Sequence, residues 1–439
     1  MEEKFISIKE AIEKCKKEGD KAKIAVRGWV YRERGSNKLK FLVLRDSTNI
    51  IQCVLEKERF PEEVWKEIDK IRIESSVEII GEIKEDKRAP TGYEISCEKI
   101  NIIQVAEEFP INKDLNEELL GDRRHLWLRS RKMTSILKIR STVFGAIHEY
   151  FRENGFYEYQ SPIFQSVQAE GGSTLFNVDY FGKKGVFLAQ TWQLYAEPAI
   201  FSLEKIYTIA PSFRAEKSQT ARHLTEYWHA EMEMAWASFK NIQDHGEGLI
   251  KHIVKKVLER NKEELELLGR DIKKLEPTVN KDFPRMTYDD ALKILDEKFN
   301  MKIEWGKDLR TIEEDKLSQL YDTPIIVTNY PKEVKAFYMK ETPENPRVVN
   351  GCDFIGPEGY GELIGGSERE SDPQIIIKKL KDGGENPEHY NFYLDTRRYG
   401  TVPHGGFGMG VERIISWICG LTTIKDAIPF PRTVARTSP

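Results

Sequence analysis

One segment in the middle of the chain carries cationic side chains in a pattern that suits a polyphosphate. Phe213-Arg214-Ala215-Glu216 follows a β-like run and precedes a polar loop, 217–222, that leads to His223-Leu224. A second run, 227–236, then resumes with alternating character, which predicts two strands joined by a long loop. Such a loop can hold phosphate groups, because guanidinium groups pair with their oxygens through two parallel hydrogen bonds. Taken alone, the pattern is better interpreted as a surface salt bridge on a hairpin.

A glycine-rich run near the C-terminus suits a flat ligand. Glycine alternates with larger residues over 406–410, and Val411-Glu412-Arg413 follow. Residues without a Cβ let a ligand approach closely, and Arg413 can stack on a base or meet a phosphate. A Rossmann fingerprint is excluded because no βαβ unit follows the run. We expect a turn at 405–410 and a helix from Glu412 to Cys419.

The elements that position these segments follow from periodicity. Apolar residues recur at helical spacing from Lys132 to Asn154, and Gly155 ends that helix before a strand at 156–159 and Pro162. A charged, amphipathic helical insertion is expected at about 239–285. Further strands are expected at 324–328, 336–340 and 361–364.

The N-terminal part has a different pattern. Short β-rich runs separated by turn signals occupy 24–31, 40–46, 50–55, 76–83 and 93–104, with a helix-like insert at 62–71. Five strands with a helix between the third and fourth predict a closed barrel of the oligonucleotide-binding (OB) type. We therefore expect a barrel domain with a leading helix over 1–106, a linker over 107–124, and a second domain over 125–439.

Composition limits the class of protein. Of the 439 residues, 39% are hydrophobic and 32% charged, and no stretch approaches the ~20 apolar residues of a membrane span. The N-terminus carries no secretory pattern, so a cytoplasmic protein without a membrane partner is expected. The net charge of −4 disfavours a strongly cationic wrapper of nucleic acid but allows a local basic footprint, and no DNA partner is expected. The five cysteines show neither metal-ligand spacing nor a disulfide framework.

Together these features resemble the class II aminoacyl-tRNA synthetases. The helix, strand and Pro162 resemble motif 1, residues 213–233 motif 2, and 406–413 motif 3, in the family's order. The N-terminal barrel is similar to that of the aspartate, asparagine and lysine subgroup. The resemblance covers nearly the whole chain and implies an α+β fold, an antiparallel six-stranded sheet flanked by helices, and a homodimer formed around Pro162.

The resemblance also implies an ATP site. Arg214 is expected on the α-phosphate and the amino-acid carboxylate, Tyr227 and Arg413 on either face of adenine, and Arg222 and His223 on the outer phosphates. Glu362, with Asp353 as a weaker candidate, is expected to hold Mg²⁺. No protein nucleophile is needed, because adenylation depends on positioning and charge neutralisation. The implied catalytic residues are Arg214, Glu216 and Arg413. The implied ATP-binding residues are Arg214, Glu216, Arg222, His223, Leu224, Tyr227, Glu362, Gly410 and Arg413.

Three segments are similar to the parts of the family that select the amino acid. Residues 169–173 resemble a mobile flap in which Glu170 faces the substrate ammonium, and 190–197 resemble the substrate strand, with Gln193 near that group. Where aspartate enzymes of the family have a lysine this chain has Ala196, and Glu197 is expected to accept hydrogen bonds from a substrate amide. Facing aspartate, Glu197 would set two carboxylates together, which favours asparagine. The implied amino-acid site comprises Glu170, Gln193, Glu197, Arg214, Gly365 and Arg369.

The barrel is expected to read the central anticodon uridine that asparagine and aspartate tRNAs share. By resemblance Phe41 stacks on it while Arg34 and Gln52 hydrogen-bond or pair with it. Without that resemblance, Phe41 is equally well interpreted as a core residue of an alternating strand.

The sequence thus predicts an ATP-dependent ligase for asparagine and asparagine tRNA. An aspartate-charging or dual-specificity ligase, a paralogous ATP-dependent asparagine synthetase, and a catalytically silent RNA-binding or signalling module are the competing interpretations. The barrel disfavours the synthetase, and retention of Arg214, Glu216, Glu362 and Arg413 disfavours the silent module.

Overall fold

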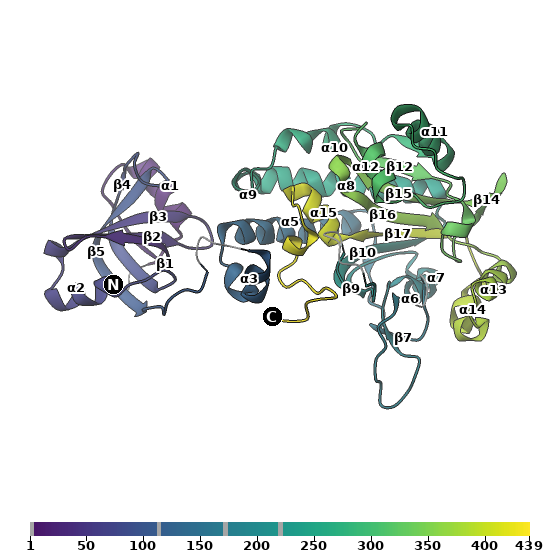
Figure 1. Ribbon diagram of the computed structural model, residues 1–439, viewed down its shortest axis with the longest axis horizontal. Coiled ribbons are helices and arrows are strands. Elements are labelled where there is room, and N and C mark those ends of the chain that lie inside the picture. The colour runs from purple at the N-terminus through teal and green to yellow at the C-terminus, as the bar shows by residue number, and fades with distance from the viewer. Residues whose placement is uncertain (1–3, 112–115, 170–173, 218–222) are drawn as a thin grey trace. The chain divides into compact units, whose positions relative to one another are not determined.

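The computed structural model describes residues 4–111, 116–169, 174–217 and 223–439, which form two compact units, Met1–Leu120 and Gly121–Pro439. The boundary between the units falls inside the segment predicted as a linker. Each unit is described by itself (Figure 1). No helix in the described parts of the chain has the length and apolar content for a membrane crossing.

The N-terminal unit is a closed five-stranded barrel with the order β1-β2-β3-β5-β4, which confirms the predicted OB-type barrel. Inward positions of β4 alternate with outward ones, so Val77, Ile79 and Ile83 are buried, as the two-residue period of a strand requires. The strands are β1 (Ala22–Gly35), β2 (Leu39–Arg45), β3 (Ile50–Glu56), β4 (Ser76–Glu85) and β5 (Tyr93–Gln104), with α1 (Ile8–Glu18) before them and α2 (Glu62–Asp69) between β3 and β4.

The second unit is built on an eight-stranded sheet with the order β11-β12-β15-β16-β17-β10-β9-β6. The six inner strands are antiparallel, and β11 and β6 add to the two edges in parallel. The predicted antiparallel six-stranded sheet is therefore present, extended by one short strand at each side. The bounds are β6 (Tyr157–Glu158), β9 (Lys205–Phe213), β10 (Glu226–Ala235), β11 (Arg285–Thr287), β12 (Ile325–Thr328), β15 (Gly351–Gly356), β16 (Gly361–Glu368) and β17 (His404–Gly410).

Helices and short hairpins surround this sheet (Figure 1). The hairpins are β7 (Phe164–Gln165) with β8 (Phe187–Leu188), and β13 (Glu341–Thr342) with β14 (Asn345–Val349). The helices are α3 (Glu117–Asp122), α4 (Arg124–Trp127), α5 (Arg131–Glu153), α6 (Gln193–Ala196), α7 (Ile200–Leu203), α8 (Phe239–Arg260), α9 (Lys262–Leu267), α10 (Glu276–Asn280), α11 (Tyr288–Phe299), α12 (Thr311–Ser318), α13 (Pro373–Asp382), α14 (Asn391–Arg398) and α15 (Val411–Cys419).

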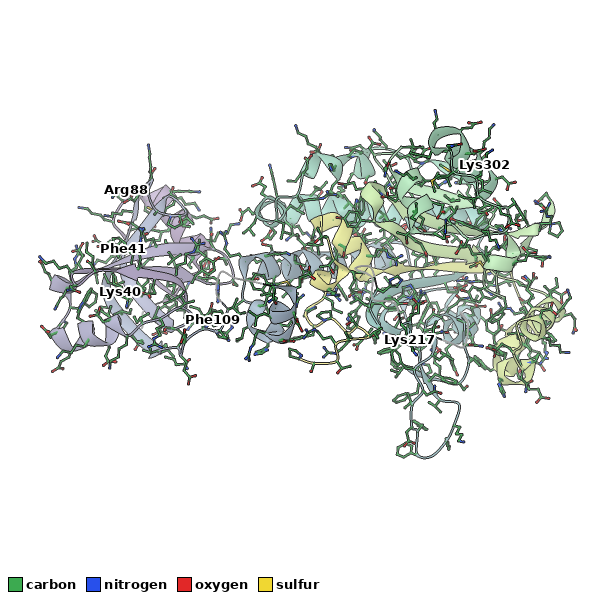
Figure 2. All side chains as sticks on the ribbon, viewed as in Figure 1. Lys40, Phe41, Arg88, Phe109, Lys217 and Lys302 are labelled. Carbon is green, nitrogen blue, oxygen red and sulfur yellow. The ribbon has the colours of Figure 1, made fainter. Side chains whose placement is uncertain are left out.

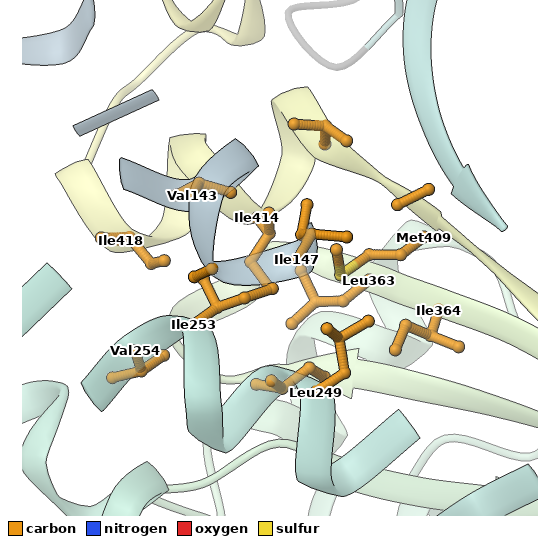
Figure 3. Packing of buried hydrophobic residues seen from close by; sticks show 14 of the residues in the cluster. Val143, Ile147, Leu249, Ile253, Val254, Leu363, Ile364, Met409, Ile414 and Ile418 are labelled. Atoms are coloured by element: carbon orange, nitrogen blue, oxygen red, sulfur yellow. The ribbon is translucent and has the colours of Figure 1, made fainter. Parts of the chain in front are cut away.

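The main core lies between the sheet and helices α5, α8 and α15. Helix α5 starts at a side-chain cap, Ser130, and ends before Gly155, whose φ of 77° suits glycine. Branched aliphatic side chains from the three helices meet Leu363 and Ile364 of β16 and Met409 of β17 (Figure 3). The cluster includes Val143, Ile147, Leu249, Ile253, Val254, Leu363, Ile364, Met409, Ile414 and Ile418.

Three predicted elements are wrong in type. The run 405–410 belongs to strand β17, between β10 and β16, because its neighbours approach too closely for side chains: a Cβ on Gly406 would lie 2.0 Å from the Met232 carbonyl oxygen. Residues 336–340 form a turn beside β16 rather than a strand. The predicted substrate strand at 190–197 contains helix α6, at whose start the N–H groups of Trp192 and Gln193 donate to Glu231 and to Thr191 Oγ1.

Arg124 joins the first and last parts of this unit. Its guanidinium, 4% exposed as a residue, donates to the carbonyl oxygens of Lys425, Ile428 and Pro429 and to the Asp426 carboxylate, at 2.7–3.1 Å. Burial lowers the pKa of Arg124, and Asp426 opposes that effect. The backbone carbonyl groups of residues 425–429 that accept from Arg124 thus have hydrogen-bond donors in the interior.

Candidate active site

A cavity of about 850 Å³ opens above β10, β16 and β17, and residues of the predicted site meet there. Strands bring them together because alternate side chains of neighbouring strands share one face of a sheet. Six predicted residues line it: Gln193, Arg214, Asp353, Glu362, Gly365 and Arg369. The other walls include Lys332, Lys335, Lys378 and Lys379, whose positive charges no sequence motif indicates.

The segment predicted to be motif 2 forms two antiparallel strands, β9 and β10. Arg214 follows β9, and its guanidinium lies over the Tyr227 ring at 5.9 Å from the centroid. His223 Nε2 lies 3.9 Å from the Glu216 carboxylate, and Leu224 is 7% exposed. The predicted phosphate cation Arg222 and the predicted flap residue Glu170 lie outside the described residues.

The glycine-rich strand β17 provides a flat floor. A Cβ on Gly408 would lie 2.5 Å from His229 Nε2, so glycine keeps that ring against the floor. After Gly410 the chain turns into α15, where Glu412 pairs with Arg140 of α5 at 2.7 Å. The Arg413 guanidinium donates to the Glu362 carbonyl oxygen and borders a separate cavity of about 220 Å³. Tyr227 and Arg413 are thus not among the described residues that line the larger cavity.

Two carboxylates, Asp353 and Glu362, flank Gly365 across β15 and β16. A Cβ on Gly365 would lie 2.7 Å from Glu362 Oε1 and 3.7 Å from Asp353 Oδ1. Burial raises the pKa of Asp353 to about 6, with the charge of Glu362 adding to it and Lys335, 2.6 Å away, opposing it. Burial and the same two carboxylates raise the pKa of Glu314 to about 8. Such crowding of negative charge is relieved by a cation, so these oxygen donors fit Mg²⁺.

At the other end of the cavity, Gln193 presents one side of its amide. Its Nε2 donates to Glu197 at 2.9 Å, which turns the oxygen away from Glu197. Glu197 itself is fully buried and is not among the described residues that line the cavity. Glu197, which was expected to accept from a substrate amide, therefore lies behind the cavity wall, and Gln193 stands between Glu197 and the cavity.

Two further carboxylates, Glu231 and Glu233, occupy the wall where Glu197 was expected. Glu231 accepts from the Trp192 N–H at 2.9 Å, and Glu233 pairs with Arg369 through two hydrogen bonds of 3.0 and 2.9 Å. His229, Glu231 and Glu233 are spaced two residues apart in β10, so their side chains share the face of the strand that borders the cavity. This two-residue spacing of polar groups was visible in the sequence and could have identified them.

Arg369 is held firmly against this wall. Its NH1 donates to Ser367 Oγ at 2.7 Å, and its guanidinium lies over the Tyr338 ring at 5.0 Å. Burial opposes its charge, but Glu233 outweighs that effect and raises the pKa of Arg369. Among the described residues, three of its five N–H groups have protein partners, so the guanidinium can still donate to a ligand oxygen.

In the barrel, the three predicted RNA-reading residues lie together. Phe41 of β2 is labelled on the barrel in Figure 2. Arg34 of β1 is paired with it across the sheet, and the Arg34 guanidinium lies over that ring at 5.0 Å from its centroid. Arg34 also donates to Gln52 Oε1 at 3.3 Å, and Gln52 Nε2 donates to Glu94 at 2.9 Å. Gln52 is only 5% exposed, so it positions Arg34 by accepting its hydrogen bond. Arg34 and the half-buried Phe41 are the members of this group that a ligand can contact.

Comparisons with known proteins agree with this architecture. Residues 116–434 match the family model of tRNA synthetases class II (D, K and N), and residues 24–103 match an OB-fold nucleic acid binding domain. The chain belongs to the class II tRNA synthetases of this D, K and N family, as the three sequence motifs predicted.

Individual relatives cover almost the whole chain. An asparagine–tRNA ligase of Thermoplasma acidophilum is 48% identical over 95% of this chain and 97% of its own, and one of Thermococcus kodakarensis is 48% identical over 96% and 97%. Among solved structures, asparaginyl-tRNA synthetase of Pyrococcus horikoshii complexed with asparaginyl-adenylate is 44% identical and matches all of both chains with a TM-score of 0.93. The fold and the family predicted from the sequence are confirmed.

Proposed function

We infer that the protein is an asparagine–tRNA ligase, which joins asparagine to the 3′ end of asparagine tRNA at the expense of ATP. The observation that carries this inference is the agreement with asparagine–tRNA ligases along nearly the entire chain, through both the barrel and the catalytic unit. ATP and asparagine enter as substrates of the catalytic unit and tRNA as the substrate that both units bind. We place the reaction in the cytoplasm.

In the first step the asparagine carboxylate attacks the α-phosphorus of ATP in line, and pyrophosphate leaves. Arg214, which lines the cavity next to Tyr227, neutralises the carboxylate and the α-phosphate, while Glu216 and His223 frame the loop beside them. The likeness to motifs 2 and 3 supports a base held between Tyr227 and Arg413, which lie outside the described lining of the larger cavity. Gln193 Oε1 accepts from the substrate ammonium. No protein group forms a covalent bond, because positioning and charge neutralisation supply the acceleration.

Mg²⁺ belongs to this proposal, with Glu362 and Asp353 as its protein ligands. When bound, the ion neutralises phosphate charge. Titrating Mg²⁺ in an asparagine-dependent ATP–pyrophosphate exchange assay tests the assignment. Glu362→Gln should shift the half-saturating Mg²⁺ concentration upward at least severalfold, whereas Glu341→Gln, a change to another acidic lining residue, should not. Equal Mg²⁺ dependence of the two variants would contradict the assignment.

The preference for asparagine over aspartate follows from the charges of the cavity wall. Ala196 brings no cation to the substrate side chain, and the wall facing it already carries the carboxylates of Glu231 and Glu233, so the side-chain carboxylate of aspartate would be a third and would be repelled. The decisive experiment compares exchange with asparagine and with aspartate. A rate with aspartate equal to that with asparagine would overturn the assignment in favour of an aspartate-charging or dual-specificity ligase.

Assays with and without tRNA distinguish the ligase from an asparagine synthetase and from an RNA-binding module. Ammonia-dependent formation of free asparagine without tRNA would indicate the synthetase, and absence of any exchange would indicate the RNA-binding module. For the barrel, Phe41→Ala should raise the KM for tRNA about tenfold or more, because base stacking contributes about 1–3 kcal/mol per base. The same variant should leave exchange unchanged, since that reaction needs no tRNA.

We also propose a homodimer formed around motif 1. The two-residue strand β6 leaves an edge of the sheet open, and Tyr157 and Phe164 on either side of the exposed Pro162 are 60% and 51% exposed. An open strand edge beside exposed aromatic groups offers a surface that a second copy of the chain can cover. Analytical ultracentrifugation should give twice the 51.0 kDa chain mass, and Phe164→Glu should give the monomer.

A further inference from the structure

A layer of charged side chains lies behind the amino-acid end of the cavity. It consists of Glu197 after α6, Arg397 of α14 and His404 of β17, and all three side chains are 0% exposed. The described lining of the cavity includes none of them. The predicted sequence motifs also leave Arg397 and His404 without a role. Burying three ionisable groups is costly unless their charges are matched, so the arrangement needs an explanation.

Glu197 accepts hydrogen bonds from four side chains. Gln193 Nε2 and the Tyr393 hydroxyl donate to Oε1, each at 2.9 Å, and Arg397 and His404 reach Oε2 at 2.5 and 3.0 Å. A carboxylate offers about four acceptor positions, so Glu197 is filled without any substrate. Burial alone would raise its pKa, but Arg397 and His404 outweigh burial and hold the pKa of Glu197 below its usual range. Glu197 is therefore an anion.

Arg397 is bound on every side by acceptors. Besides Glu197 it donates to the Tyr393 hydroxyl at 2.8 Å, the Glu370 carbonyl oxygen at 3.0 Å and Thr396 Oγ1 at 2.7 Å. Its cation is thus fixed at one place behind the cavity. Because Glu197 in turn holds the Gln193 amide, Arg397 acts on the cavity wall only through Glu197 and Gln193.

His404 has acceptors on both ring nitrogens. Nδ1 lies 2.8 Å from the Val402 carbonyl oxygen and Nε2 lies 3.0 Å from Glu197. These two contacts fix the position of the ring beside Glu197, whereas the permanent positive charge of the layer is that of Arg397.

The charged layer lies close to the cavity wall. Ligand atoms of Glu197, Glu233 and His404 lie within 4.8 Å of one another, so a change of charge in the layer acts on the wall. Each of the two carboxylates has its own guanidinium, because Arg397 pairs with Glu197 and Arg369 pairs with Glu233. Two balanced ion pairs suit a substrate side chain that is itself neutral, whereas a carboxylate would arrive without a counter-charge.

We propose that Arg397 is a positioning residue that sets amino-acid selectivity by balancing the charge of Glu197, and that the balance of the two buried ion pairs is what discriminates asparagine from aspartate. This rests on the proposed ligase function. Relative to wild type, Glu197→Gln leaves the two pairs with one excess positive charge, Arg397→Met leaves them with one excess negative charge, and the double variant restores the balance. The two single changes must therefore shift the binding of aspartate in opposite directions.

The test is the inhibition constant of aspartate against asparagine-dependent exchange. One unit charge about 10 Å away in an effective dielectric of about 20 changes a binding constant by about tenfold. We expect Glu197→Gln to lower the aspartate inhibition constant, relative to the KM for asparagine, by about tenfold, and Arg397→Met to raise it similarly. The double variant should return to within about threefold of wild type. The KM for ATP should stay within about twofold in all three variants.

Two controls separate this role from a structural one. Arg397→Lys keeps the charge and should keep the wild-type ratio, even if the KM for asparagine rises. Arg398→Met changes the neighbouring arginine of α14, which is 41% exposed and bonded to Asp395, and should alter nothing. Circular dichroism and melting temperature check folding. If Arg397→Met does not fold, the aspartate inhibition constants of the double variant and of Glu197→Gln still test the proposal, because the double variant should lie closer to wild type.

Shifts in the same direction from both single variants, or a double variant no closer to wild type than Glu197→Gln, would overturn the proposal. That result differs from failure of the proposed function, which wild-type protein would reveal by showing no asparagine-dependent exchange.

Discussion

The ion pair between Glu233 and Arg369 offers a sharp test, because it contributes to both stability and substrate binding. Glu233 is 1% exposed and Arg369 is 4% exposed, and two hydrogen bonds join them. Arg369→Met keeps much of the side-chain volume but leaves a buried carboxylate without its partner. Breaking a buried pair in this way costs about 3–5 kcal/mol, whereas replacing both members by neutral groups is often nearly neutral.

The expected results follow from this asymmetry. Arg369→Met should lower the free energy of unfolding of the catalytic unit by about 3–5 kcal/mol, and Glu233→Gln/Arg369→Met should recover most of that loss. Both variants should lose asparagine-dependent exchange, because the guanidinium that lines the cavity is absent in both. Urea unfolding followed by tryptophan fluorescence measures the first quantity and pyrophosphate exchange the second.

The cost of Arg369→Met should also depend on pH. Burial raises the pKa of Glu233, and Arg369 opposes that effect, so removing Arg369 raises the pKa further. A carboxylate with a raised pKa in the folded state destabilises the fold increasingly as the pH rises from its unfolded-state pKa to its folded-state pKa, and the destabilisation is lost as the pH falls back over that range. The deficit relative to wild type should therefore grow as the pH rises above the ordinary carboxylate range. A deficit below about 1 kcal/mol, or a double variant no more stable than the single one, would refute the reasoning.

Three further predictions concern other parts of the molecule. Gly406→Ala should abolish exchange and destabilise the sheet, since its Cβ would lie 2.0 Å from the Met232 carbonyl oxygen and 2.3 Å from Glu233 Oε2. The control Gly410→Ala, whose Cβ would have its nearest neighbour at 3.7 Å, should fold normally. Equal melting temperatures of the two variants would contradict the prediction. The pKa of Glu314 is raised to about 8, so the folded state keeps a proton that the unfolded state loses, and stability falls as pH rises from about 5 to 8. Glu314→Gln should remove that fall, so its gain over wild type in chemical denaturation should grow with pH; a gain independent of pH would count against it. Arg45→Met removes the guanidinium that the buried Glu74 contacts through two hydrogen bonds of 2.9 Å, so the barrel should lose about 3–5 kcal/mol while exchange persists. Loss of stability and of exchange together would contradict this prediction.

Elements with a regular local pattern could be predicted from the sequence. The barrel strands alternate apolar and polar residues between turn signals, and helix α5 shows helical spacing between a serine cap and Gly155. Strand β17 could not be predicted in this way, because glycine has a low strand propensity and carries no pattern. Its conformation is set by β10 and β16 on either side, which leave no room for a Cβ at Gly405 or Gly406.

The candidate site was predictable where a motif is contiguous and was not where it is assembled from distant segments. Arg214, Glu362 and Arg369 were found through their sequence neighbours, and all three line the cavity. Arg397 and His404 lie about 200 residues from Glu197, and nothing near them in the sequence indicates that they meet it. The sequence also does not show how the chain turns after α6. Glu197 was therefore expected in the cavity wall, whereas it lies buried behind that wall.

The bonds of Arg124 to the last turn of the chain have a practical consequence for engineering. They place the start of the catalytic unit beside residues 425–429, and Arg436 also pairs with Asp122 at 2.8 Å. Chain ends held this close can be connected by a short peptide, and new ends can be opened in an exposed loop. The catalytic unit is therefore suited to circular permutation. Deletion of residues 421–439, in contrast, would remove the carbonyl and carboxylate partners of the buried Arg124 guanidinium and should prevent folding.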